Sequence, residues 1–431
     1  MTTALPALVR ADETNVFPRN LDWAYPNIER AEGVRLFRTD GTEILDACGG
    51  GAMVACLGHG RRDIVDAATR QAEQLSYVYY HAFTNERQEE LADRVIEVAA
   101  PEMARARFVT GGSEANEMAL RLARAYHAER GDSRWRIVSP AQSYHGSTLG
   151  TLALTGRHSL RHSYEPYLAG HLHIPPSVDD AGEAALAELD RILQEAGDSV
   201  AAFLCEPISA ASLPGYSPPQ AFWEGLAERR DRHGFLVVFD EVVTGFGRTG
   251  SWFAYHQIPL VPDIVTFGKT LGAGYAPLAG ILCAGHVYEA VASGSREFEH
   301  GHTWDGAPLL CQVGLAVVAA LQNERLVERV SERGPALRNE LEDAVGGLDL
   351  VREVRGRGFL LGIELRAPAA ALVEEVTLDH GVLVLATHSG ADGFTGDHVL
   401  LAPAYNASDA DLAEIVERIA AALSDVEGRL T

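Results

Sequence analysis

The sequence predicts an α/β protein in which helices cover both faces of a mostly parallel sheet, with a smaller α+β domain formed by both chain ends. A length of 431 residues is more than one average domain needs. From about residue 105, short and continuously apolar runs alternate with helical stretches, as is typical of strands buried on both faces. These runs are 107–110, 136–139, 201–205, 235–239, 264–267 and 278–283. The expected parts are an N-terminal arm with part of the smaller domain (1–60), the large domain (61–305) and the C-terminal part of the smaller domain (306–431).

The N-terminal part is expected to contain few regular elements. Residues 1 to about 35 are polar and include prolines, so we expect an irregular arm. An Asp40-Gly41 turn then joins two short expected strands, 34–38 and 43–46. The glycine-rich segment 49–60 has the wrong spacing for the G-x-G-x-x-G dinucleotide motif. Helical patterns follow at 61–76 and 86–99.

The C-terminal part reads as helices with a few short strands. A long apolar helix begins near residue 306, and a second helix is expected at 326–345. Short strands are expected near 359–365 and 382–386, followed by a closing helix that Ser408 caps. The apolar stripe of the first helix is Leu310, Val313, Val317 and Leu321, and that of the closing helix is Leu412, Ile415, Val416, Ile419 and Leu423.

Composition excludes several classes of function. A net charge of −24 lacks the basic patch that nucleic acid or an anionic membrane surface requires. No apolar stretch approaches the ~20 residues of a membrane span, and the first residues have no signal-peptide layout, so we expect a cytoplasmic protein. The five cysteines are scattered and form no C-x-x-C pair, which favours a reducing compartment and indicates no metal site.

A glycine-rich turn follows the 107–110 run. Gly111, Gly112 and Ser113 stand directly before a helical pattern, and we expect Ser113 at its N-cap. Glycines let the backbone approach a ligand closely, and a helix start offers free N–H groups with a partial positive charge. The segment therefore predicts an anion site, although an ordinary capped helix would have the same appearance.

Lys269, just after the 264–267 run, is the only lysine in the chain; all the other cationic side chains among the 36 Lys and Arg are arginine. Arginine stays protonated and is a poor nucleophile, whereas a desolvated lysine amine can attack a carbonyl and form a Schiff base. A lysine left by chance in an arginine-biased composition is the plain alternative.

Polar side chains follow three further apolar runs. Asp240 and Glu241 follow 235–239, Glu206 follows 201–205, and Tyr144-His145 comes shortly after 136–139. In parallel sheets ligands bind beyond the carboxyl ends of the strands, so these residues are expected near Lys269. Alone, His145 and Tyr144 would read as structural residues.

A nucleotide hydrolase is a distant alternative. The run before Asp240 resembles a Walker B strand, and Gly268-Lys269-Thr270 resembles the end of a Walker A motif. However, Asp263 stands where the first Walker A glycine should be, and the lysine follows the acidic pair instead of preceding it.

The set fits pyridoxal 5'-phosphate better. Its aldehyde requires a lysine, its phosphate an anion site, and its pyridine nitrogen an acid that keeps it protonated. Tyr144 and Val242 are candidates for the two faces of the ring. The sequence therefore predicts a pyridoxal-phosphate enzyme.

These motifs resemble the class III (ω-) aminotransferases of fold type I over nearly the whole chain. The most specific segments are Gly111–Asn116, Tyr144–Gly146, Asp240–Gly250, Gly268-Lys269 and Gly301–Thr303. The resemblance implies ping-pong transfer of an amino group from a primary amine or ω-amino compound to a carbonyl acceptor, commonly a keto acid. It also implies a homodimer with shared active sites.

The resemblance assigns roles to individual residues. Lys269 would form the Schiff base and shuttle the proton, and Asp240 would pair with the pyridine nitrogen. The remaining cofactor-binding residues would be Gly112 and Ser113 at the phosphate, Tyr144 and Val242 on the ring faces, His145 and Glu206 close by, and Thr303 at the phosphate of the neighbouring subunit.

The chain departs from the family where many members hold a substrate carboxylate with a C-terminal arginine. No Arg or Lys lies between Arg366 and Arg418. Either another arginine does this work, or His388 does so weakly, or the usual acceptor is not a dicarboxylate. Met53, Phe83 and His388 are the expected substrate-pocket residues, although Met53 could equally be part of the core.

The motifs leave the reaction type open in two ways. A pyridoxal-phosphate aminomutase or a decarboxylating aminotransferase could have the same fold and motifs, because the substrate pocket decides between them. A descendant that only binds the cofactor is the other alternative, and the intact Lys269 and Asp240 argue against it.

Overall fold

The computed structural model describes residues 6–178, 181–388 and 396–430. Its largest element is a seven-stranded sheet in the order β6-β12-β11-β10-β9-β7-β8. The strands are β6 (Met103–Val109), β7 (Arg136–Pro140), β8 (Leu172–Ile174), β9 (Val200–Cys205), β10 (Leu236–Glu241), β11 (Ile264–Phe267) and β12 (Ala279–Ala284). Only β12 runs against its neighbours, so the prediction of a mostly parallel sheet is confirmed. The other strands therefore present their carboxyl ends at one edge.

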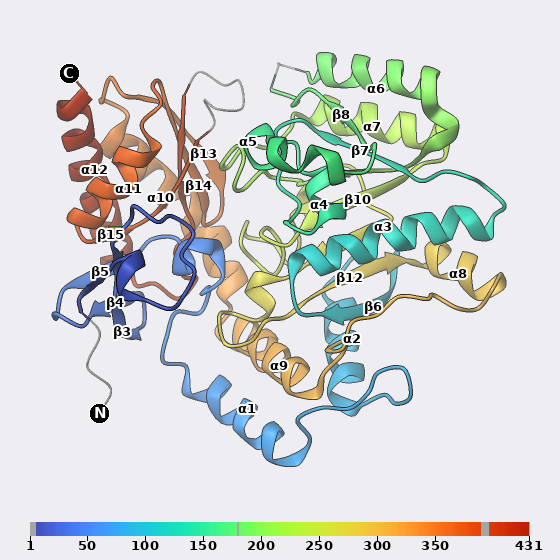
Figure 1. The fold of residues 1–431 in the computed structure, drawn as a ribbon, viewed down its shortest axis with the longest axis horizontal. Coiled ribbons are helices and arrows are strands. Elements are labelled where there is room, and N and C mark those ends of the chain that lie inside the picture. Colours follow the sequence, from blue (N-terminus) through green and yellow to red (C-terminus); the bar gives the residue numbers. More distant parts are fainter. Residues whose placement is uncertain (1–5, 179–180, 389–395, 431) are drawn as a thin grey trace.

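Helices cover both faces of this sheet (Figure 1). Along β10, Leu236 and Val238 pack in a buried cluster with residues of α3 and α8. Val237 and Phe239 point to the opposite face, where aromatic residues of α7 pack against them. The helices of this part are α1 (Arg62–Gln74), α2 (Glu86–Glu97), α3 (Gly112–Glu129), α4 (Leu149–Leu154), α5 (His158–Arg161), α6 (Glu183–Ala196), α7 (Gln220–His233) and α8 (Gly285–Ser293). The helix α9 (Pro308–Asn323) comes from the range expected in the smaller domain, but it packs against α1 and α2.

The smaller domain contains two four-stranded sheets, and one of them joins the two ends of the chain. In this sheet the order is β15-β5-β4-β3, with β15 parallel to β5. Figure 1 shows the blue N-terminal strands beside the orange and red C-terminal helices. The elements are β3 (Ile28–Glu32), β4 (Arg35–Arg38), β5 (Glu43–Asp46), β13 (Val351–Arg357), β14 (Leu360–Leu365), β15 (Val382–Leu383), β16 (Leu385–Thr387), β17 (His398–Leu401), α10 (Leu326–Val345), α11 (Ala370–Asp379) and α12 (Asp409–Leu430).

Two sequence expectations for this smaller domain are wrong. Residues 28–32 were expected in an irregular arm but form the edge strand β3, whose polar and largely exposed residues carry no apolar pattern. The arm also contains a short strand pair, β1 (Leu8–Val9) with β2 (Tyr25–Pro26). The strand expected at 382–386 is split between two sheets, because β15 pairs with β5 whereas β16 pairs with β17.

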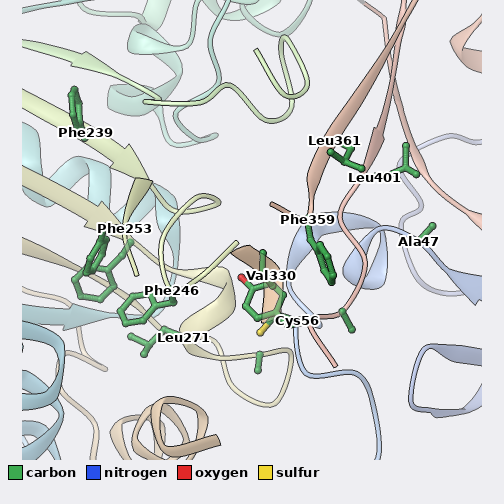
Figure 2. Packing of buried hydrophobic residues seen from close by; sticks show 14 of the residues in the cluster. Ala47, Cys56, Phe239, Phe246, Phe253, Leu271, Val330, Phe359, Leu361 and Leu401 are labelled. Carbon is green, nitrogen blue, oxygen red and sulfur yellow. The ribbon is translucent and has the colours of Figure 1, made fainter. Parts of the chain in front are cut away.

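One large buried cluster runs through both parts of the molecule. It includes Phe239 and Phe246 from the large domain, Cys56 between the parts, and Phe359 and Leu361 from the smaller domain (Figure 2). Burial of apolar surface on this scale is the main stabilising term in folding. The expected stripes of α9 and α12 are buried in it, and all five cysteines are free and buried. Within the described ranges, no helix combines the length and apolarity that a bilayer crossing requires.

Candidate active site

Asp240 lies at the carboxyl end of β10 and points to the face covered by α3, as the alternation along the strand dictates. Its side chain is 6% exposed and accepts several hydrogen bonds. Oδ2 lies 2.8 Å from Nδ2 of Asn116 and 2.8 Å from Nδ1 of His145. Oδ1 accepts from the Val242 N–H at 3.1 Å and from the Thr266 hydroxyl at 3.3 Å. A buried carboxylate held by this many donors has a fixed orientation.

Asn116 and Thr266 are site residues to which the sequence reasoning gave no role. Nδ2 of Asn116 also donates to the His145 carbonyl at 2.8 Å, and its Oδ1 accepts from the Thr266 hydroxyl at 2.8 Å. Thr266 stands directly opposite Asp240 in the pairing of β11 with β10. The available signal was an asparagine on the buried face of α3, where it is 1% exposed among apolar neighbours.

Lys269 follows β11 in a single 3₁₀ turn, at the same sheet edge as Asp240. Burial lowers the pKa of its amine below the usual lysine range, while the negative charges of Asp240 and Glu206 oppose that shift. No hydrogen-bond or ion-pair partner occupies this amine among the residues described. The structure thus presents a lysine whose nitrogen is free to react.

Gly112 and Ser113 lie at the start of α3. A Cβ atom added to Gly112 would come within 2.8 Å of Cγ1 of Val242, so glycine is needed for this close approach. The expectation that Ser113 is the N-cap is wrong, because Gly111 precedes the helix and Ser113 belongs to its first turn. The Ser113 hydroxyl instead accepts from the Ser147 N–H at 3.1 Å, which ties the turn after β7 to the helix start.

Tyr144 and Glu206 lie side by side at the ends of β7 and β9. The Tyr144 N–H donates to Oε2 of Glu206 at 3.4 Å, and the Ala210 N–H donates to Oε1 at 3.0 Å. Burial raises the pKa of Glu206 to about 7, with the nearby Asp240 charge adding to this shift. Glu206 is therefore a carboxyl group that can exchange its proton near neutral pH.

Thr303 and Phe83 lie on two loops that contact each other through the rings of Trp304 and Tyr77, whose centroids are 5.3 Å apart. Thr303 is exposed, and Phe83 is 62% exposed. Among the described residues, no hydrogen bond, ion pair or ring contact joins either of them to Lys269 or Asp240.

The other two expected pocket residues have different surroundings. Met53 is 2% exposed in a small apolar cluster with Ile208 and Leu400. The His388 side chain is 54% exposed, and its Nδ1 lies 4.0 Å from Oδ2 of Asp397. Many family members are expected to have a carboxylate-binding arginine in the segment after His388. Residues 389–395 of this segment lie outside the described residues.

The residues at this sheet edge fit pyridoxal phosphate. Lys269 supplies a partly desolvated amine, Asp240 a fixed negative charge, and the start of α3 an anion site. Val242 lies against both Gly112 and Gly268, so an apolar face stands between the anion site and the lysine. Nothing in this set requires a metal ion.

Comparison with known proteins shows the family of this chain. Residues 16–423 match the model of the class III aminotransferase family. The chain is 36% identical to acetylornithine aminotransferase 1 of Bordetella bronchiseptica over 82% of this chain and 86% of that protein. It is 32% identical to an uncharacterized aminotransferase of Schizosaccharomyces pombe, over 94% of both chains.

Solved transaminases have the same fold. A transaminase from the marine bacterium Virgibacillus superposes with a TM-score of 0.91 at 26% identity, covering 97% of this chain and 98% of that one. A thermostable (S)-enantioselective omega-transaminase from Thermomicrobium roseum gives a TM-score of 0.88 at 31% identity, with 96% of both chains covered.

Fold and site together define an enzyme that uses pyridoxal phosphate, built on fold type I. The family match spans most of the chain and the relatives are aminotransferases. The protein belongs to the class III aminotransferases.

Proposed function

We propose that this aminotransferase moves an amino group from a primary amine or ω-amino compound to a carbonyl acceptor, often a keto acid, by a ping-pong mechanism. The observation that carries the proposal is the position of Lys269, the only lysine of the chain, at the same sheet edge as the hydrogen-bonded carboxylate of Asp240. When bound, pyridoxal phosphate supplies the aldehyde and the electron-withdrawing ring.

Lys269 and Asp240 perform the chemical roles in this proposal. Because burial lowers the pKa of the Lys269 amine, this nitrogen would be the group that binds the cofactor's aldehyde and that accepts and returns a proton at the substrate carbon. The Asp240 carboxylate would hold a proton on the pyridine nitrogen. His145 and Asn116 fix the orientation of this carboxylate through the two hydrogen bonds to Oδ2.

The remaining residues bind the cofactor in this proposal. Gly112 and Ser113 bind the phosphate, and Tyr144 and Val242 pack on the two faces of the ring. Glu206 lies beside Tyr144, and its pKa of about 7 allows it to donate or accept a hydrogen bond. Met53, Phe83 and His388 are the proposed contacts for the substrate.

A homodimer is part of the proposal, with Thr303 reaching the phosphate bound by the partner subunit. The exposure of Thr303, of Phe83 at 62% and of Trp304 at 48% supports it, because aromatic residues exposed on adjoining loops are typical of protein interfaces. Phe83 would then contact the substrate bound by the partner subunit.

The decisive experiment is the absorbance spectrum of the purified holoenzyme, before and after adding a primary amine that lacks an α-carboxylate. A violet band that fades on adding the amine is the expected result. A band that does not respond would favour an α-amino acid donor, an aminomutase or a decarboxylating enzyme. No band, even with added cofactor, would contradict the role of Lys269.

A Lys269→Ala variant is the control for this spectrum. It removes the only lysine amine and should abolish the violet band and nearly all turnover while leaving the fold intact. Full turnover by this variant would overturn the proposed mechanism.

A further inference from the structure

Arg248 is a fully buried cation in the loop after β10, with 0% of its surface exposed. Its direct partners among the described residues are backbone carbonyls and the ring and hydroxyl of Tyr405, and none is a carboxylate. Nη1 donates to the carbonyl of Pro403 at 2.6 Å and to that of Phe359 at 3.2 Å. Asp46 interacts with this charge electrostatically but does not contact it, so the few groups that bind the guanidinium directly matter for keeping it in place.

All of these partners belong to the smaller domain. The Phe359 N–H donates back to the Arg248 carbonyl at 3.0 Å, which makes the contact reciprocal. The Arg248 guanidinium carbon lies 4.5 Å from the ring centroid of Tyr405, a distance at which a cation and an aromatic face attract each other. Arg248 therefore fixes the Tyr405 ring against the large domain.

Tyr405 extends this contact to the residue next to the reactive lysine. Its hydroxyl oxygen lies 3.2 Å from Oγ1 of Thr270, and both side chains are 0% exposed. The Tyr405 N–H donates to the carbonyl of Cys56 at 2.8 Å, so the backbone of Tyr405 is anchored as well. Water has no access to replace the hydroxyl pair, and each oxygen depends on the other for this hydrogen bond.

The backbone of Lys269 needs such an anchor. Its φ of +39° lies in the left-handed region, which is strained for a residue that has a Cβ atom. The N–H groups of Gly272 and Ala273 both donate to the Lys269 carbonyl, at 3.1 and 3.0 Å. These bonds tie the turn to itself, whereas the Thr270 side chain ties it to Tyr405.

We propose that Tyr405 and Arg248 are positioning residues of the aminotransferase reaction: Arg248 holds the Tyr405 ring, and the Tyr405 hydroxyl anchors Thr270 and with it the strained turn that presents the Lys269 amine. The inference rests on the proposed role of Lys269. It makes the smaller domain a determinant of the rate through Tyr405, which is not among the proposed cofactor and substrate contacts.

The test compares variants of the two hydroxyl groups. Tyr405→Phe keeps the ring against Arg248 but removes the hydroxyl, which meets Thr270 and also interacts with the Arg248 guanidinium. Thr270→Val removes only the Thr270 partner. Each variant should slow the reaction of holoenzyme with excess primary amine by about fivefold. This corresponds to about 1 kcal/mol, since a tenfold change in rate corresponds to about 1.4 kcal/mol. KM for the amine should stay unchanged, and Thr270→Ser should restore the rate.

Coupling between the two side chains is measured by combining them. The Tyr405→Phe/Thr270→Val double variant should be about as slow as either single variant, because both remove the same contact. Arg248→Lys keeps the positive charge but removes the planar guanidinium with its several N–H donors, and it should also slow the reaction.

A second measurement does not depend on turnover. In the full-length protein with and without cofactor, hydrogen exchange at the amides of Gly272 and Ala273 should speed up in Tyr405→Phe. The matched control is Tyr255→Phe, a buried tyrosine whose hydroxyl accepts from the Ala100 N–H at 2.8 Å. That variant should lose thermal stability but keep normal exchange at these amides and a normal rate.

Three results would overturn the inference. They are an unchanged rate in Tyr405→Phe, a double variant whose loss of rate equals the product of the two single losses, or a loss of rate in Tyr255→Phe equal to that in Tyr405→Phe. Failure of the wild-type holoenzyme to absorb in the violet or to react with any amine would instead overturn the proposed function. The two failures are therefore distinguishable.

Discussion

Replacing Asp240 with asparagine tests the centre of the proposed mechanism with almost no change of shape. In the native site Oδ2 accepts from Asn116 and Oδ1 accepts from the Val242 N–H. Asparagine must place its NH₂ group on one of these two sides, where it meets another donor. A hydrogen bond to a charged group contributes about 1.5–3 kcal/mol, so the free energy of unfolding should fall by about 2 kcal/mol.

The effect on the reaction should be larger than this loss of stability implies. Asp240→Asn removes the negative charge that, in the proposed mechanism, keeps the pyridine nitrogen protonated, and loss of one preorganised electrostatic group typically slows an enzyme about 100-fold or more. The assay is a single-turnover reaction of holoenzyme with a primary amine, followed by absorbance at saturating amine. Urea denaturation of the same preparations measures the free energy of unfolding.

Asp263→Asn is the matched control. Asp263 stands just before β11, at the opposite end of that strand from Lys269, and it is 8% exposed. Its Oδ2 accepts from the Val237 N–H at 2.6 Å, and Oδ1 lies 3.1 Å from Nε2 of His286. This variant should lose stability while its rate stays within about twofold of the wild type. A near-normal rate in Asp240→Asn, or an equal loss of rate in both variants, would refute the reasoning.

Three further predictions concern other parts of the molecule. Burial raises the pKa of Glu241 to about 7 from an ordinary value of 4.5, so the native state binds an extra proton between these pH values. The free energy of unfolding should therefore fall by about 3 kcal/mol as pH rises through this range. Glu241→Gln should remove this fall in urea denaturation at pH 5 and pH 8, and the same difference between the two pH values in wild type and variant would contradict the prediction. If Thr303 acts across the dimer, inactive Lys269→Ala and impaired Thr303→Val protomers should regain activity when co-expressed, since one of the two sites in the mixed dimer is intact; no gain over the separate variants would argue against sharing. Thr266→Val leaves Oδ1 of Asn116 without its donor and should slow turnover about tenfold, whereas Thr266→Ser should not; equal rates would remove Thr266 from the site.

The placement of several candidate site residues at one sheet edge could be predicted from the sequence, because these polar residues stand at strand ends. Asp240 and Lys269 each follow a continuous apolar run, and the edge of a parallel sheet brings such positions together. Asn116 and Thr266 were not assigned roles, because their position depends on which residue of β11 lies opposite Asp240. Apolar patterning determines which face a side chain takes, but it does not determine the register between two strands buried on both faces.

The fold, too, could be predicted from the sequence only in part. The apolar runs predicted six of the seven strands of the large sheet but not the short β8, and the helical patterns predicted helices such as α10, which spans the expected residues 326–345. The polar strand β3 and the charged strand β13 have no alternating pattern, because each lies at the edge of its sheet and buries few side chains or none. Ser113 shows a similar limit, since its hydroxyl serves the turn after β7 instead of the helix start.

The sheet that joins both chain ends has a consequence for synthesis in the cell. β5 ends at Asp46 and leaves the ribosome long before its parallel partner β15, which begins at Val382. Until then β5 has an open edge that other nascent chains could pair with. Chains that terminate before residue 382 should therefore aggregate even when the large domain has folded, and completion of this sheet should be a late and slow event.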